Sequence, residues 1–342
     1  MQFMVTLFGK PDNGVWAIQN LESIELQPAD GDDRFFRVKD DLFLAQPNII
    51  GTIRWVLGQS TVPMVAHIDG EPILRCLGTG FFVSCSGLLI TAAHVVAEVL
   101  DKKYGAVKEV DDRTWYLGGM KLGVMVPINH VMTGFKEYIF REVEWACFLA
   151  DRTESPLPFK DMDLKLTSDI AICKVKPISE NVPFQPLTIV QKGLKGIGMQ
   201  VGKSVSIVGY GAMQNVELSQ IKENVISGSF PFELHVSRGE IVERFPDNGI
   251  NKQALSPGPC FSTSAKLPAG MSGSPIYDDE RIYVHGVVST GWQDETGLAG
   301  LGYGSMLSHS MQIPISPLDN KSLLDLMSTT EHGISKISVP DA

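Results

Sequence analysis

Apolar residues in this chain fall mostly into short runs that are separated by clusters of turn-forming residues. Such runs cover residues 64–68, 73–83, 88–92, 170–175, 204–208, 228–236, 275–277 and 283–289, with further candidates at 2–8, 15–27 and 34–38. The chain contains 33 glycines and 20 prolines, which interrupt helices and favour turns. Short apolar runs bounded by turns are typical of β-strands. The pattern therefore predicts an all-β fold.

The clearest helical pattern lies after residue 315. Ser316 is a suitable N-cap, Pro317 suits the first helical position, and Asp319 has the spacing of a capping box. The apolar stripe of this segment consists of Leu318, Leu323, Leu324 and Met327. We therefore predict a C-terminal helix that packs on the preceding strands.

Composition and charge narrow the classes of function. Of 342 residues, 44% are hydrophobic and 20% are charged, which is typical of a folded globular protein and excludes a disordered chain. A net charge of −10 argues against general binding to nucleic acid or anionic lipid. The first ten residues lack the pattern of a secretory signal, and Gly87, His94 and Glu98 interrupt the apolar window at 81–100. We expect no nucleic-acid partner and no membrane association.

The cysteines and histidines give no pattern of a metal site. The five cysteines form no Cys-x-x-Cys pair, and they are Cys76, Cys85, Cys147, Cys173 and Cys260. An odd number of cysteines without metal spacing is best explained by reduced thiols in a reducing compartment, so we expect a cytoplasmic protein. The glycines at 196–202 miss the dinucleotide-binding spacing by one residue. No metal and no cofactor is expected.

Three segments carry candidate chemistry. His94 follows an apolar run and the small residues Ala92 and Ala93, Asp169 directly precedes the apolar run 170–175, and Ser272 stands between Gly270 and Gly273. Each has an ordinary structural explanation when taken alone: a core histidine, a turn-capping aspartate and a surface turn. Their combination is more informative, because a histidine, an aspartate and a serine can together form a nucleophilic triad.

In this order and context, the three segments resemble the trypsin/chymotrypsin superfamily of serine proteases, in particular its bacterial-type trypsin-like peptidases. The resemblance covers roughly residues 60–310. The matching motifs are Thr91-Ala-Ala-His94, Asp169-Ile-Ala-Ile, Gly270-Met-Ser272-Gly-Ser-Pro275, Gly209-Tyr-Gly211 and Gly286-Val-Val-Ser-Thr-Gly291. The resemblance implies an all-β, chymotrypsin-like fold of two packed six-stranded antiparallel β-barrels.

The implied division of the chain has four parts. Residues 1–50 would be a β-rich N-terminal extension, and residues 51–185 would form the first barrel with His94 and Asp169, including an insertion at about 101–165. Residues 186–315 would form the second barrel with Ser272, and residues 316–342 the C-terminal helix and tail.

The resemblance also implies the roles of the site residues. Ser272 would be the nucleophile, His94 the general base and then acid, and Asp169 the residue that orients the imidazole. The backbone N–H groups of Gly270 and Ser272 would form the oxyanion hole. Ser289 would support Asp169, and the edge formed by Ser289, Thr290 and Gly291 would pair with the substrate backbone.

Substrate preference has two interpretations at this stage. Lys266 stands six residues before Ser272, where the family places the base of the P1 pocket, and a cation there would favour acidic P1 side chains. The favoured alternative is that Lys266 reaches solvent and the pocket is apolar. Gly291 and Gly302 would leave the pocket open for a side chain.

The chain departs from secreted relatives at two positions. Val95 follows His94 where they often have a cysteine, and Met271 precedes Ser272 where secreted zymogens carry an aspartate. Activation by a freed N-terminus is therefore not expected. The predicted function is a regulated serine endopeptidase with a protein or peptide substrate and a regulatory partner protein. The alternative is a non-catalytic recognition module on a protease-like scaffold.

Overall fold

The structure is a computed structural model. It describes residues 2–8, 16–20, 35–37, 60–101, 104, 107–111, 113–129, 136–152, 164–177, 183–190, 200–222, 225–228, 230, 232–245, 256–278, 283–293 and 299–337.

Six strands of the first half form a closed antiparallel barrel. The neighbours run in the order β4–β5–β6–β11–β10–β9, and β9 pairs back to β4. The strands are β4 (Thr61–Ile68), β5 (Ile73–Phe82), β6 (Leu88–Thr91), β9 (Met120–Asn129), β10 (Lys136–Arg152) and β11 (Leu164–Val175). Closure leaves no free sheet edge within this ring of strands.

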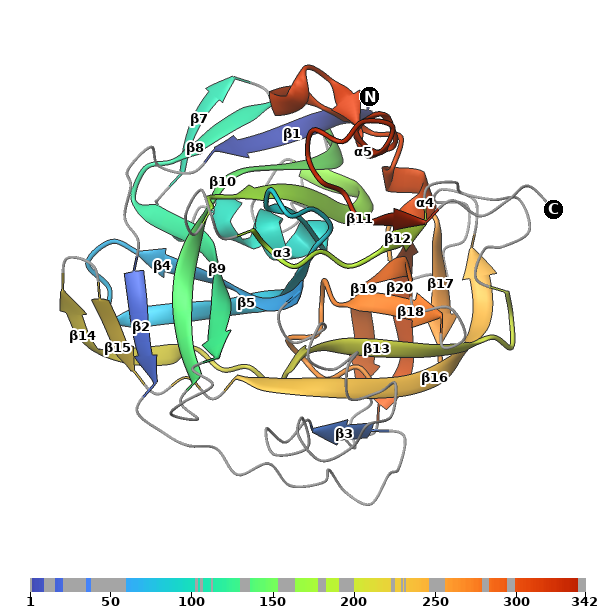
Figure 1. Cartoon of the computed structure of the whole chain (residues 1–342), viewed down its shortest axis with the longest axis horizontal. Coiled ribbons are helices and arrows are strands. Elements are labelled where there is room, and N and C mark those ends of the chain that lie inside the picture. Colours follow the sequence, from blue (N-terminus) through green and yellow to red (C-terminus); the bar gives the residue numbers. More distant parts are fainter. Residues whose placement is uncertain are drawn as a thin grey trace.

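A second closed antiparallel barrel follows along the chain. Its order is β13–β16–β17–β20–β19–β18, and β18 pairs back to β13. The strands are β13 (Ser204–Gly211), β16 (Glu233–Phe245), β17 (Cys260–Thr263), β18 (Pro275–Asp278), β19 (Val284–Gln293) and β20 (Ala299–Met306). Figure 1 shows the two barrels side by side, the first mainly blue to green and the second mainly yellow to orange. The predicted pair of six-stranded barrels is confirmed.

Several strands outside the two barrels join their sheets. In the first part of the chain these are β1 (Gln2–Phe8), β2 (Trp16–Asn20), β3 (Phe35–Arg37), β7 (Val107–Asp111) and β8 (Thr114–Leu117). In the second part they are β12 (Ile189–Val190), β14 (Val216–Lys222), β15 (Val225–Gly228) and β23 (Lys336–Ile337). A separate two-stranded sheet consists of β21 (Pro314–Ile315) and β22 (Lys321–Ser322).

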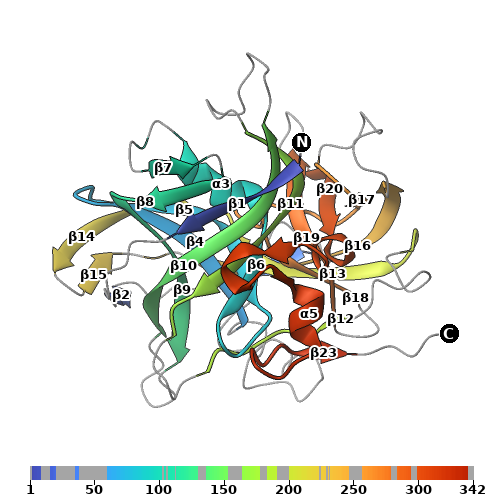
Figure 2. The ribbon, with the colours of Figure 1, turned by 90° about the horizontal axis from the view of Figure 1, so that it is seen from above.

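These pairings change the division expected from the sequence. Residues 120–129 and 136–152, assigned to an insertion at 101–165, are instead the barrel strands β9 and β10. The described strands of residues 1–50 form no separate unit, because β1 pairs with β10 over residues 145–151 and β3 pairs with β16. Figure 2 shows β1 alongside β10. Strand β14 lies beyond residue 186 and yet pairs with β5 of the first barrel.

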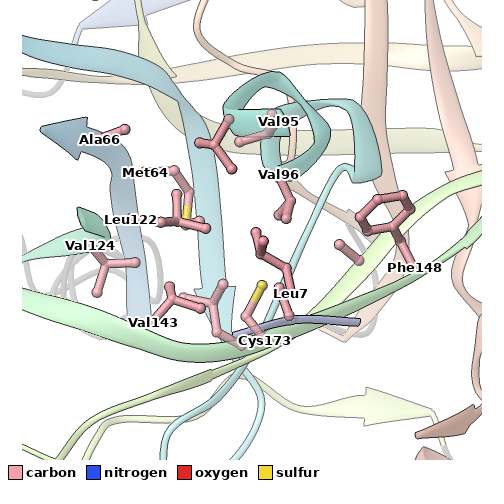
Figure 3. Close-up of a cluster of buried hydrophobic side chains, with 14 of the residues drawn as sticks. Leu7, Met64, Ala66, Val95, Val96, Leu122, Val124, Val143, Phe148 and Cys173 are labelled. Carbon is pink, nitrogen blue, oxygen red and sulfur yellow. The ribbon is translucent and has the colours of Figure 1, made fainter. Parts of the chain in front are cut away.

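A buried apolar cluster fills the interior of the first barrel. Figure 3 shows Met64 of β4, Phe148 of β10 and Leu7 of β1 converging there with Val95 and Val96. The two valines belong to the short helix α3 (Ala93–Ala97), which follows β6 directly and continues into the 3-10 helix η1 (Glu98–Leu100). Their burial fixes α3, and therefore His94, against the barrel.

The C-terminal helix is present, but it begins later than predicted. Residues Ser316–Leu318 form the 3-10 turn η3, and Asp319 and Asn320 then have φ values of 55° and 58°, which no α-helix accommodates. The helix α5 (Leu323–Met327) begins after Ser322, which forms a capping box with Asp325. A further short helix, α4, spans Leu307–Ser310.

Among the described residues, no helix has the length and apolar character needed to cross a membrane.

Candidate functional site

Strand pairing brings His94 and Asp169 together although they are 75 residues apart in the sequence. In the antiparallel pair of β6 and β11, Thr91 lies opposite Ala171. His94 comes three residues after the end of one paired segment, and Asp169 two residues before the start of the other. The side chain of Asp169 is 2% exposed and that of His94 is 32% exposed. One side of the imidazole thus faces a buried carboxylate while the ring stays accessible.

The carboxylate of Asp169 accepts several hydrogen bonds. The backbone N–H of His94 donates to Oδ1 (2.9 Å), and His94 Nδ1 lies 3.0 Å from Oδ1 and 2.9 Å from Oδ2. The hydroxyl of Ser289 donates to Oδ2. Burial alone would raise the pKa of Asp169, but the charge of His94 and these hydrogen bonds outweigh it, so the pKa lies below its ordinary value. Because an ionised carboxylate only accepts, Nδ1 carries a proton, and Nε2 is the nitrogen that can act as a base when the ring is neutral.

Ser289 connects this pair to Ser272. The hydroxyl of Ser272 donates to the carbonyl oxygen of Ser289 (3.1 Å), while the Ser289 hydroxyl binds Asp169. The three residues predicted from the sequence are therefore joined through Ser289. A hydroxyl has a single proton, so the Ser272 hydroxyl must turn away from the Ser289 carbonyl before it can donate to a different acceptor.

The loop around Ser272 has an unusual pattern of backbone hydrogen bonds. Four consecutive carbonyl oxygens accept one each: Ala269 from Ala212 N (2.7 Å), Gly270 from Thr79 Oγ1 (3.0 Å), Met271 from Ser274 N (3.0 Å) and Ser272 from Thr79 N (2.7 Å). All four peptide planes are therefore fixed. Since C=O and N–H of a trans peptide point in opposite directions, the orientations of the N–H groups are fixed too.

Two N–H groups of this loop stand out. Those of Met271 and Gly273 donate to Pro268 O (3.2 Å) and Val288 O (2.7 Å), whereas those of Gly270 and Ser272 have no acceptor among the described residues. Gly270 and Gly273 have φ values of 93° and 88°, which favour glycine. Two oriented donors beside a serine hydroxyl can bind a negatively charged oxygen.

Thr79 is a residue of this site that the sequence analysis missed. It lies in β5, is fully buried, and binds the loop through its N–H and its hydroxyl. The same hydroxyl oxygen accepts a hydrogen bond from Tyr210 N (3.0 Å). In the sequence, Thr79 is one small residue between two glycines of a predicted strand, so no pattern distinguished it.

The expected substrate edge lies next to Ser272. Strand β19 pairs with β18 only through residues 284–287, and beyond them Val288 binds Gly273 and Ser274. From Ser289 to Gln293 no described strand pairs with β19 on that side. On its other side β19 pairs with β20, where Thr290 lies opposite Tyr303 and Gly291 opposite Gly302. The backbone of residues 289–291 can therefore accept an added strand.

The described residues contain no group of three His, Cys, Asp or Glu side chains that could hold a metal ion.

Comparison with known proteins identifies the family. Residues 78–287 match the trypsin-like peptidase domain, and this range contains His94, Asp169 and Ser272. The chain belongs to this family. No curated protein sequence matches it significantly.

Three solved structures illustrate the likeness of this trypsin-like peptidase domain to known folds. The chain is similar to Deg5 (TM-score 0.41, 15% identity, covering 70% of this chain and 83% of Deg5). It is also similar to neuropsin, a serine protease of mouse brain (TM-score 0.40, 15% identity, 74% and 92% covered). A third is the MamO protease domain of Magnetospirillum magneticum (TM-score 0.38, 13% identity, 73% and 93% covered).

Proposed function

We propose that the chain is a serine endopeptidase that hydrolyses peptide bonds through an acyl-enzyme intermediate. The observation that supports this best is the set of hydrogen bonds that joins His94, Asp169, Ser289 and Ser272 beside two oriented N–H donors. Each group needed for acyl transfer has a candidate here: a nucleophile, a base, a residue that orients the base, and donors for the oxyanion.

The reaction would begin with attack of Ser272 Oγ on the scissile carbonyl carbon. His94 Nε2 takes the hydroxyl proton, and Asp169 stabilises the resulting imidazolium. The carbonyl oxygen becomes an oxyanion that the N–H groups of Gly270 and Ser272 bind. When the C–N bond breaks, His94 returns the proton to the leaving amine. Water then attacks the acyl carbon while His94 takes its proton, and His94 passes this proton to Ser272 Oγ as the ester bond breaks and the acid product leaves.

Substrate binding would also free the nucleophile. A peptide that pairs with residues 289–291 as an antiparallel strand directs a backbone N–H at the carbonyl oxygen of Ser289. In the free protein that oxygen accepts from Ser272. The incoming N–H shares this acceptor and weakens its bond with Ser272, which makes it easier for the Ser272 hydroxyl to turn to His94.

The loop geometry bears on regulation as well. Met271 cannot form the ion pair expected in secreted zymogens, but the carbonyl oxygens of the loop already have donors. Oriented donors of this kind need no freed N-terminus to form the oxyanion hole. We therefore place any regulatory partner at the access to the substrate edge and not at the oxyanion hole.

A fluorophosphonate probe and a set of fluorogenic peptides test the proposal together. The wild type should be labelled at Ser272 and should hydrolyse peptides, whereas Ser272→Ala should do neither while its unfolding curve stays close to that of the wild type. Ser274→Ala is the matched control, because the nearby Ser274 hydroxyl is buried and has no hydrogen-bond partner among the described residues; it should keep both activities.

The alternative function has its own signature. Peptide binding by a folded wild type that shows neither labelling nor turnover would contradict the endopeptidase and favour a non-catalytic recognition module.

A further inference from the structure

Two glycines face each other on adjacent strands next to the proposed substrate edge. Gly291 of β19 and Gly302 of β20 are cross-strand partners. Neither has a positive φ, so the backbone conformation does not require glycine at these positions. The reason must lie in the space that a side chain would occupy.

Leu267 fills that space. A Cβ atom on Gly302 would lie 2.2 Å from Leu267 Cδ1 and 2.8 Å from its Cγ, and a Cβ on Gly291 would lie 2.6 Å from Leu267 O and 3.0 Å from its Cβ. The Leu267 side chain is buried and packs in the core of the second barrel with Met271 and Val288. It is therefore held by its neighbours as well as by the two glycines.

This position coincides with the place of the P1 side chain if the proposed function holds. A peptide paired with residues 289–291 and attacked by Ser272 sends its P1 side chain between that strand and the loop that leads to Gly270. Leu267 belongs to that loop. The sequence analysis expected Gly291 and Gly302 to leave an open pocket, but in the structure Leu267 occupies the room they leave.

The structure also distinguishes Leu267 from Lys266. The nearest side-chain atoms to both glycines belong to Leu267, and Lys266 is half-buried and makes interactions of its own. Gly302 thus faces the branched hydrocarbon of Leu267, whereas Gly291 faces the backbone carbonyl oxygen and Cβ of the same residue, and neither faces an ammonium group.

We infer that Leu267 closes the P1 pocket and restricts the endopeptidase to peptides with a small uncharged P1 side chain, such as Ala, Ser or Val. A shallow apolar pocket gives no partner to a charged group and no room to an aromatic ring. A P1 side chain that is larger than a fixed apolar pocket by a methylene or so lowers kcat/KM by about 10–200-fold.

A fluorogenic peptide series that differs only at P1 (Ala, Val, Leu, Phe, Glu, Lys) tests the inference on the full chain. The wild type should cleave the Ala and Val peptides at least tenfold better than the Phe, Glu and Lys peptides. Leu267→Ala should raise kcat/KM for Leu or Phe peptides about tenfold relative to the Ala peptide. If the alanine variant does not fold, Leu267→Val replaces it in this test. Lys266→Ala is the control, and its preference among the P1 residues should equal that of the wild type.

The same peptides, titrated by fluorescence polarisation against Ser272→Ala, report the P1 preference without turnover. Absence of hydrolysis by the wild type together with a preference for small P1 residues in binding would refute the proposed function and support the pocket. Hydrolysis or binding that favours Phe, Lys or Glu would refute the pocket and leave the endopeptidase in place. A Glu preference that Lys266→Ala abolishes would assign the pocket to Lys266.

Discussion

The buried hydroxyl of Thr79 offers a way to disturb the loop of residues 269–273, which carries the proposed oxyanion donors, from outside that loop. Thr79→Val keeps the shape of the side chain and removes only the hydroxyl. The Gly270 carbonyl then loses its donor at 3.0 Å, and Tyr210 N loses its acceptor at 3.0 Å. The N–H of Thr79 still binds the Ser272 carbonyl, so the proposed nucleophile is not moved directly.

The expected losses differ for stability and for catalysis. Each of the two polar groups left without a partner costs about 1–3 kcal/mol, so the free energy of unfolding should fall by about 2–6 kcal/mol. The peptide plane that follows Gly270 then keeps only the bond from Met271 N–H to Pro268 O. This plane lies between the two planes that carry the N–H groups of Gly270 and Ser272, so the alignment of these proposed oxyanion donors loosens. Loss of one such donor lowers kcat by about 10²–10³-fold. Because the donor acts mainly on the transition state, KM should change by no more than about threefold.

Steady-state kinetics at a temperature where each variant is fully folded, together with urea unfolding, measure both effects. Thr79→Ser retains the hydroxyl and should restore kcat to within about threefold. Thr6→Val is a matched control, since Thr6 is also buried and its hydroxyl contacts only the Cys147 sulfur at 3.7 Å among the described residues. A kcat of Thr79→Val within threefold of the wild type, or an effect confined to KM, would refute the role assigned to Thr79.

Three further predictions follow from other parts of the structure. Asp169→Asn should lower kcat by about 10⁴-fold through the wrong imidazole tautomer. The same carboxylate has a folded-state pKa below its ordinary value of 3.8, so its stabilising contribution is present above that pH and is lost as the pH falls below it; the difference in unfolding free energy between wild type and Asp169→Asn should therefore shrink in acid. Ser322→Ala removes the capping box of α5 and should cost about 1 kcal/mol in urea unfolding, and a neutral result would contradict the cap. Leu7→Ala should cost about 3 kcal/mol because Leu7 is 1% exposed in the first barrel's core, and less than about 1 kcal/mol would mean that β1 is not part of the cooperative fold.

The sequence was sufficient for the short motifs and the barrel fold, but not for the full extent of the first barrel. Residues 136–152 looked like a surface insertion because they include many charges. Arg141 and Glu142 are in fact 4% and 2% exposed, and Glu142 forms an ion pair with Lys176 at 2.8 Å. A charged side chain usually indicates an exposed position, but it can be buried when an oppositely charged residue pairs with it. When that residue comes from a distant segment, the local sequence pattern does not reveal it.

The start of the C-terminal helix shows a second limit. The sequence analysis placed the capping box at Ser316 and Asp319, whereas in the structure Ser322 forms it with Asp325. The left-handed backbone at Asp319 and Asn320 prevents the helix from beginning at Ser316. Such a conformation depends on the surrounding packing.

The pocket and the loop illustrate the same limit at the site. The resemblance to the protease superfamily placed His94, Asp169 and Ser272 in candidate roles. It located Lys266 near the base of the P1 pocket without identifying the residue that faces the two glycines, which is Leu267 in the structure. Thr79 and Leu267 act through contacts between segments, Thr79 across 191 residues to Gly270. Only the three-dimensional fold makes such pairs visible.

The pairing of β1 with β10 has a consequence for synthesis on the ribosome. Gln2 lies opposite Asp151, so the first strand is made long before its partner exists. At about 5–20 residues per second, roughly 10–30 s pass before the complementary strand is translated, and longer before it leaves the exit tunnel. During this interval β1 lacks its β10 partner, and an unpaired strand edge can pair with other chains.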